Sequence, residues 1–140
     1  MNPLLLDTDT LSEVLKRRNQ IVLANARAYV AQHQQFAFSA ITRYEVRRGN
    51  LSRRAAARLQ RFETFCRHSA IYPITDDVLD RAAVLWADAR AGGLPDNDAD
   101  LIIAATALIH GRTLTTGNTS HFAWIPGLQL ADWRAGPQGQ

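Results

Sequence analysis

Carboxylates stand beside apolar segments at three places in the sequence, and such residues could serve metal chemistry. Asp98 and Asp100 come just before the apolar run "LIIAATALI". Asp7 ends the run "PLLLD", and Glu45 lies within "AITRYEVRR". Ionised carboxylates are costly to bury alone, so several of them converging would require a divalent cation such as Mg²⁺ or Mn²⁺. Such an ion can activate a water and stabilise charge that develops on a phosphate.

Residue spacing alone leaves the roles of these acids open. Asp98 and Asp100 each begin an apolar stripe at helical spacing, so periodicity does not choose between them. A helix cap or a first-turn acid favoured by the helix macrodipole is the alternative role for each. Glu45 shares with Tyr44 the stripe that we expect to face the protein, and its alternative role is an ion pair with Arg48.

Short apolar runs alternate with helical patterns along the chain. The expected strands are residues 3–7, 35–39, 70–74, 113–116 and 128–133, with helices between them. This alternation predicts an α/β fold with a short parallel sheet of four to five strands, covered by helices on both faces. Ligands of such sheets bind at the carboxyl ends of the strands, which is where we expect Asp7.

Helix boundaries are predicted from capping residues. Thr10 fits the start of a capping box, and Gly49 is expected to end a helix. Ser52 and Thr75 are expected to cap the helices that follow them. Trp86 lies on an apolar stripe of its helix, which favours a place in the core.

The basic residues are concentrated in one part of the sequence. Twelve of the sixteen lie between Lys16 and Arg67, where only Glu45 and Glu63 are acidic. Most of them are Arg, whose planar guanidinium can pair with phosphate through two hydrogen bonds. The pattern favours a nucleic-acid partner, and a solvated basic face is the alternative.

Composition bounds the remaining possibilities. The chain has 140 residues, and we expect one domain over 1–134 and a disordered tail over 135–140. Cys66 is the single cysteine, so no intrachain disulfide forms. No apolar stretch reaches membrane-spanning length, which favours a cytoplasmic protein without a membrane partner. The four histidines lack zinc-ligand spacing, and no Gly-rich phosphate loop is present.

Four sequence blocks, in order, resemble those of PIN-domain ribonucleases. They are "LLLDTDTLSEVL" (4–15), "SAITRYEVRRG" (39–49), "DADLIIAATALIHGRTLTTGNTSHF" (98–122) and "IPGLQLADW" (125–133). The resemblance is closest to VapC-type toxins of toxin–antitoxin pairs, including the FitB-like ones. It implies a PIN-like three-layer fold, a Mg²⁺ or Mn²⁺ site and endonucleolytic cleavage of RNA that inhibits translation and growth.

The resemblance also implies roles for individual residues. The positions that match the family's metal-binding acids are Asp7, Glu45 and Asp100. Asn118 falls at a fourth acidic position and adds no charge, and Thr116 matches a neighbouring hydroxyl. These two are expected to position water or the scissile phosphate in a catalytic site with one metal ion. Asp9 and Asp98 are expected to support the site or cap a helix, as is Asp96.

The same resemblance implies partners. They are an RNA substrate, with tRNA and rRNA as candidates, a VapB-type antitoxin that inserts a segment often bearing an Arg into the acidic groove, and a second copy of the chain in a homodimer. The candidate RNA-binding residues are Arg43, Arg47, Arg48, Arg54 and Arg58.

Two other functions remain compatible with the residues. A metal-dependent phosphohydrolase acting on small phosphate esters could use the same acids, although the Arg-rich segment argues against it. A nucleic-acid-binding regulator without catalysis is the other alternative, and the neutral Asn118 is the residue that supports it.

Overall fold

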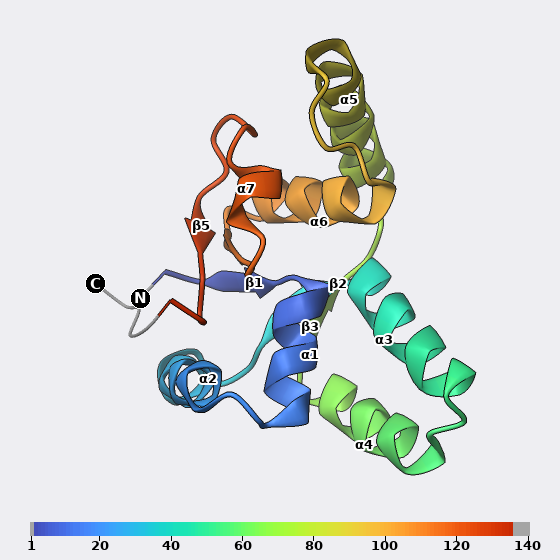
Figure 1. The fold of residues 1–140 in the computed structure, drawn as a ribbon, viewed down its shortest axis with the longest axis vertical. Helices are drawn as coiled ribbons and strands as arrows, with labels where there is room; N and C mark the ends of the chain where they lie inside the picture. Colours follow the sequence, from blue (N-terminus) through green and yellow to red (C-terminus); the bar gives the residue numbers. More distant parts are fainter. Residues whose placement is uncertain (1, 136–140) are drawn as a thin grey trace.

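The computed structural model describes residues 2–135, in which a parallel sheet lies between two layers of helices (Figure 1). In chain order the elements are β1 (Leu4–Leu6), α1 (Thr8–Lys16), α2 (Gln20–His33), β2 (Ala37–Ser39), α3 (Ala40–Ser52), α4 (Ala56–Arg67), β3 (Ala70–Tyr72), α5 (Asp76–Gly92), α6 (Asp98–Ile109), β4 (Thr113–Thr115), α7 (Thr119–Phe122) and β5 (Leu130–Ala131). The expected α/β fold and its parallel sheet are confirmed. Ala135 is described, but the rest of the predicted tail lies outside the described residues.

The sheet has the strand order β3-β2-β1-β4-β5, and every neighbouring pair is parallel. β1 is central: Leu6 pairs with Phe38 of β2 on one side and with Thr115 of β4 on the other. The direction of strand order reverses between β1 and β4. In sheets of this type the crevice at the carboxyl ends of the two strands flanking that reversal is the usual ligand site.

Two apolar cores lie on the two faces of the sheet, and β1 contributes to both. Leu5 packs into the core formed with α5 and α6, whereas Leu4 and Leu6 pack into the core formed with α1, α2 and α4. This alternation follows from the period of two along a strand. Figure 1 shows α5, α6 and α7 above the sheet and α1, α2 and α4 below it, with α3 at the side. Burial on both faces explains why the strands read as continuous apolar runs.

Three predicted helix boundaries are wrong. α1 is capped by the side chain of Asp7, which accepts from the backbone N–H of Thr10, so Thr10 is inside the helix. Ser52 ends α3 instead of starting α4, whose first residue has no side-chain cap. Gly49 does not end α3, because the helix continues to Ser52 and the chain leaves it near Arg54, which has a φ of 52°.

Two aromatic residues lie elsewhere than the helical patterns predict. Trp86 on α5 is 42% exposed and lies under the guanidinium of Arg90 at 5.0 Å, so its predicted place in the core is wrong. Tyr44 on α3 is 54% exposed, although we expected it to face the protein beside Glu45. Each ring is covered by a neighbouring Arg, which shields part of its surface from water. No helix in the described part of the chain is long and apolar enough to span a bilayer.

Candidate active site

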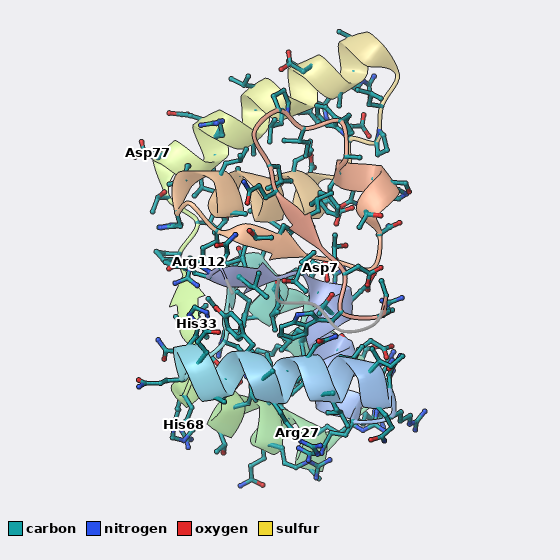
Figure 2. All side chains as sticks on the ribbon, turned by 90° about the vertical axis from the view of Figure 1, so that its left-hand side faces the viewer. Asp7, Arg27, His33, His68, Asp77 and Arg112 are labelled. Carbon is teal, nitrogen blue, oxygen red and sulfur yellow. The ribbon has the colours of Figure 1, made fainter. Side chains whose placement is uncertain are left out.

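Asp7 lies at the carboxyl end of β1, at the point where the strand order reverses. Its side chain is 5% exposed, and its Oδ1 accepts from the N–H of Thr10 at 2.8 Å. Burial raises the pKa of Asp7, and hydrogen bonds from Thr116 and Thr10 oppose that effect. Asp7 therefore joins β1 to α1 and holds a carboxylate at the sheet edge. Figure 2 shows Asp7 at this edge and Arg112 at the opposite end of the sheet.

Asp100 lies in the first turn of α6 and is half-buried. Burial is the largest cause of its raised pKa, and the negative charge of Asp7 is the next. The charges of Glu45 and Asp9 also raise this pKa. The residues that follow it in α6 include Leu101 and Ile103, which are buried and fix the helix against the sheet. The sequence-predicted acids are thus close enough to repel one another.

Glu45 is on α3, half-buried, and engaged by two neighbours. The hydroxyl of Thr8 donates to its Oε1 at 2.6 Å, and Arg48 forms an ion pair with Oε2 at 3.6 Å. The alternative role of Glu45, an ion pair with Arg48, is therefore present, and its charge also raises the pKa of Asp100.

The two residues expected to position water or phosphate follow β4. Thr116 is fully buried and hydrogen-bonds Asp7, and its Oγ1 accepts from the backbone N–H of Asn118 at 3.0 Å. The Asn118 amide nitrogen lies 3.0 Å from Nδ1 of His121. Thr116 thus belongs to the immediate surroundings of Asp7, whereas the Asn118 side chain is turned to His121.

His121 is a residue that the sequence analysis missed. Its charge lowers the pKa of Asp100, which places it near the acidic cluster, and it is exposed. Zinc-ligand spacing, which the four histidines lack, does not single out His121. The available signal was its position three residues after Asn118, one helical turn away on α7.

Asp9, Asp98 and Asp96 have different neighbours. Asp9 is exposed on the first turn of α1, and its charge raises the pKa of Asp7 and Asp100. Asp98 is exposed at the start of α6, but the cap of this helix is Asn97, whose Oδ1 accepts from the N–H of Asp100 at 3.1 Å. Asp96 pairs with Arg90 at 3.3 Å. Among the described residues Asn97 caps α6, so the cap role expected for Asp98 or Asp96 is wrong, whereas the alternative of a first-turn acid is confirmed for Asp98.

Three of the five candidate RNA-binding arginines are already paired. Arg43 and Arg47 both contact Glu63, and Arg48 contacts Glu45. Within residues 2–135, Arg54 and Arg58 form no ion pair. The only two acids of the basic segment thus neutralise part of it locally and leave the α3–α4 junction and α4 cationic.

The donor set of the site fits a hard divalent cation. No three His, Cys, Asp or Glu side chains among residues 2–135 are gathered closely enough to hold a metal ion as they stand. Mg²⁺ is commonly held by one or two carboxylates with water and substrate oxygens completing the shell. Asp7 and Asp100 can supply such a pair of carboxylates. A bound cation would offset the repulsion between Asp100 and the neighbouring acids.

Comparison with known proteins identifies the family. The sequence pattern of the PIN domain matches residues 4–125. The chain belongs to the PIN-domain family. PIN domains are generally nucleases, and this one carries its acids at the sheet edge described above. No curated protein matches the chain.

Solved toxin–antitoxin structures contain similar chains. A toxin–antitoxin complex from Klebsiella pneumoniae includes a chain with 31% identity and a TM-score of 0.69, with 89% of this PIN domain and 93% of that chain covered. FitAcB from Neisseria gonorrhoeae gives 25% identity and a TM-score of 0.79, covering 93% and 97%. VapBC2 from Rickettsia felis, bound to a promoter DNA fragment, gives 22% identity and 0.82, covering 93% and 98%, which is a likeness of fold.

Proposed function

We propose that this PIN domain is a metal-dependent endoribonuclease and the toxin of a VapBC-type toxin–antitoxin pair. The observation that carries the proposal is the electrostatic coupling of Asp100 to Asp7 where β1 ends, in a chain of this family. Cleavage of tRNA or rRNA by such an enzyme would inhibit translation and growth.

The residues of the site divide the work of the proposed reaction. Asp7 and Asp100 would hold Mg²⁺ or Mn²⁺, and Glu45 would join them when it leaves Arg48. When bound, the ion supplies activation of water and stabilisation of charge on phosphate. Thr116 keeps Asp7 oriented through its hydroxyl. Asn118 offers an amide that can orient water or a phosphate oxygen, and α6 keeps Asp100 in place through its buried face.

The proposal is tested by Asp100→Asn. We expect RNA cleavage to fall on the order of 100-fold or more, because a ligand charge that contributes several kcal/mol is removed. Asp98→Asn is the matched control: it removes the same charge two residues earlier, at an exposed position, and should leave cleavage nearly unchanged. Cleavage is measured on a mixed tRNA and rRNA substrate with Mg²⁺ or Mn²⁺.

Undiminished cleavage by Asp100→Asn protein would contradict the assignment of the site. A nucleotide monoester assayed in parallel separates the alternatives. Turnover of the monoester without RNA cleavage would indicate a small-molecule phosphohydrolase, and Mn²⁺ binding without cleavage of either substrate would indicate a regulator.

A VapB-type antitoxin is the partner that we propose. A cavity of about 970 Å³ lies between α1, α2, α3 and α4, and both Thr8 and Glu45 line it, so it adjoins the acidic site. Apolar side chains such as Val14, Leu23 and Phe62 line it together with seven cations. Those cations are Lys16, Arg17, Arg18, Arg27, Arg53, Arg58 and Arg61. This lining suits an amphipathic segment with acidic flanks.

We also propose a homodimer. Four large apolar side chains are exposed on α5 and the turn that follows it, and they are Leu79, Val84, Trp86 and Leu94. α5 forms an outer edge of the molecule in Figure 1, so a second copy can approach it. Exposed apolar surface concentrated on one element is typical of an interaction site.

A further inference from the structure

Gly117 has no side chain, and this lets the side chain of Arg134 approach its backbone closely. Its φ lies outside the left-handed region, so its backbone does not require glycine. A Cβ built at this position would lie 2.5 Å from Cζ, 2.7 Å from one terminal nitrogen and 2.8 Å from Nε of Arg134. These atoms belong to a single guanidinium, which therefore occupies the space above Gly117.

The segment that carries Arg134 is anchored on both sides of the peptide bond before it. Trp133 is 2% exposed, and its carbonyl accepts from the side-chain amide of Asn25 at 2.9 Å. The backbone N–H of Arg134 donates to Oδ1 of Asp132 at 2.9 Å. The chain that delivers this guanidinium to Gly117 is therefore fixed by contacts to α2 and within its own turn.

The guanidinium of Arg134 lies against Gly117, which follows the Thr116 partner of Asp7. Gly117 lies between Thr116, which hydrogen-bonds Asp7, and Asn118. Within the described residues, Arg134 is exposed and its side chain forms no ion pair. An Arg that forms no ion pair among the described residues and lies against Gly117, next in sequence to the partner of Asp7, offers the paired donors that bind a phosphate.

We propose that Arg134 binds a backbone phosphate of the RNA at the edge of the acidic site, with Gly117 as the cradle that admits its guanidinium. This inference rests on the proposed nuclease function. It assigns a substrate-binding residue outside both the acidic cluster and the basic segment.

Steady-state cleavage by Arg134→Ala tests the role in binding. We expect KM for RNA to rise about tenfold, because a hydrogen-bonded charge contact is lost, while kcat stays within about twofold. Arg134→Lys restores the charge without the fork and should recover most of the loss. Arg81→Ala is the control for net charge: Arg81 is exposed one turn after Asp77, which Figure 2 shows far from Asp7.

Affinity for RNA provides a readout that a merely structural role would not move. The measurement uses Asp100→Asn protein, which is expected to leave RNA intact. Adding Arg134→Ala to it should lower the slope of log RNA affinity against log salt by about 0.7, because one phosphate contact to a single strand is lost. The melting temperatures of Arg134→Ala and the wild type should agree. This binding measurement needs no cleavage, so it tests Arg134 even if the nuclease proposal fails.

Gly117→Ala separates displacement of the guanidinium from distortion of the loop. Its Cβ should push Arg134 aside and raise KM as Arg134→Ala does, and adding it to Arg134→Ala should have no further effect. Three results would overturn the proposal. Arg134→Ala could leave KM and the salt slope unchanged, or it could lower only kcat. Alternatively, Gly117→Ala could raise KM as much in the Arg134→Ala protein as it does in the wild type.

Discussion

The buried negative charges of Asp7 and Asp100 destabilise the folded state without metal. Burial raises the pKa of both carboxyl groups, and Asp7 raises that of Asp100 further. The folded chain therefore takes up a proton at Asp100 more readily than the unfolded chain, whose carboxyl has its ordinary value near 3.8. Without metal, this protonation favours folding at low pH, and that contribution is lost as the pH rises through the raised pKa.

Removing the charge of Asp100 should therefore stabilise the metal-free protein. We expect Asp100→Asn to raise the free energy of unfolding at pH 7 on the order of 1 kcal/mol, as is typical when a functional site is relaxed. The difference should shrink as the pH falls towards 4, where the wild-type carboxyl becomes protonated. Thermal unfolding in EDTA from pH 4 to pH 8 measures it.

The metal provides the control for this stability difference. Mg²⁺ or Mn²⁺ should stabilise the wild type and have little effect on Asp100→Asn, since binding to the folded state alone raises stability. A variant that is less stable than the wild type at pH 7, or a difference that does not change with pH, would contradict the electrostatic account.

At the scale of elements, α1 and the site share one residue. Asp7 accepts from the N–H of Thr10 and so caps the helix, while the same carboxylate belongs to the acidic cluster. The start of α1 therefore fixes the position of a site carboxylate, and the cap would be weakened if a metal ion drew the carboxylate away.

Two substitutions at Asp7 should separate capping from charge. Asp7→Asn keeps a side-chain oxygen that can cap α1, whereas Asp7→Ala does not, so Asp7→Ala should be less stable than Asp7→Asn by about 1 kcal/mol. Both should lose RNA cleavage to a similar extent, because both lack the charge. Urea unfolding at pH 7 and the cleavage assay measure the two effects. Equal stability of the variants would mean that the cap contributes nothing.

The elements were predictable where burial decides them. The apolar run before Asp7 predicts β1, and alternating strands and helices predict the parallel sheet, because sheets buried on both faces leave continuous apolar segments. Caps depend instead on which residue has extended backbone angles at the junction. Asp7 and Thr10 are both good caps, and only the path from β1 into α1 selects Asp7.

The arrangement of the candidate site was predictable only in part. Asp7 follows from the rule for strand ends, and the resemblance to PIN domains selected Asp100 over Asp98, which agrees with the burial of the one and the exposure of the other. The contacts of Glu45 with Thr8 and of Arg134 with Gly117 join segments that are far apart in the sequence. No local periodicity carries such information, so these contacts required the structure.

For the whole molecule, the distribution of unpaired cations among the described residues indicates where the proposed RNA substrate would bind. Glu63 neutralises Arg43 and Arg47, whereas Arg58 lines the cavity beside Glu45 without an ion pair among the described residues. Positive charge is therefore concentrated around the cavity between α1 and α4, next to the acidic site. RNA and an antitoxin segment would compete for this surface.

Salt dependence should distinguish the two kinds of arginine. Arg58→Ala should lower the slope of log RNA affinity against log salt by about 0.7, as expected for one lost phosphate contact to a single strand. Arg43→Ala should change the slope less, because Glu63 already compensates its charge. Fluorescence anisotropy between 50 and 200 mM salt, in Asp100→Asn protein, checks the comparison. Equal slopes for the two variants would contradict the pairing argument.

The place of β1 in the sheet also sets the order in which the molecule can assemble. Leu4 pairs with Thr113, and the Asp7 side chain hydrogen-bonds Thr116. β1 is synthesised first, so it can form these contacts only after β4 has been synthesised. At synthesis rates of about 5–20 residues per second, that wait is on the order of ten seconds. A growing chain is thus without its assembled acidic edge until most of it has left the ribosome. If the proposed toxin function holds, this interval would let the proposed antitoxin, when already present, meet the chain before any cleavage.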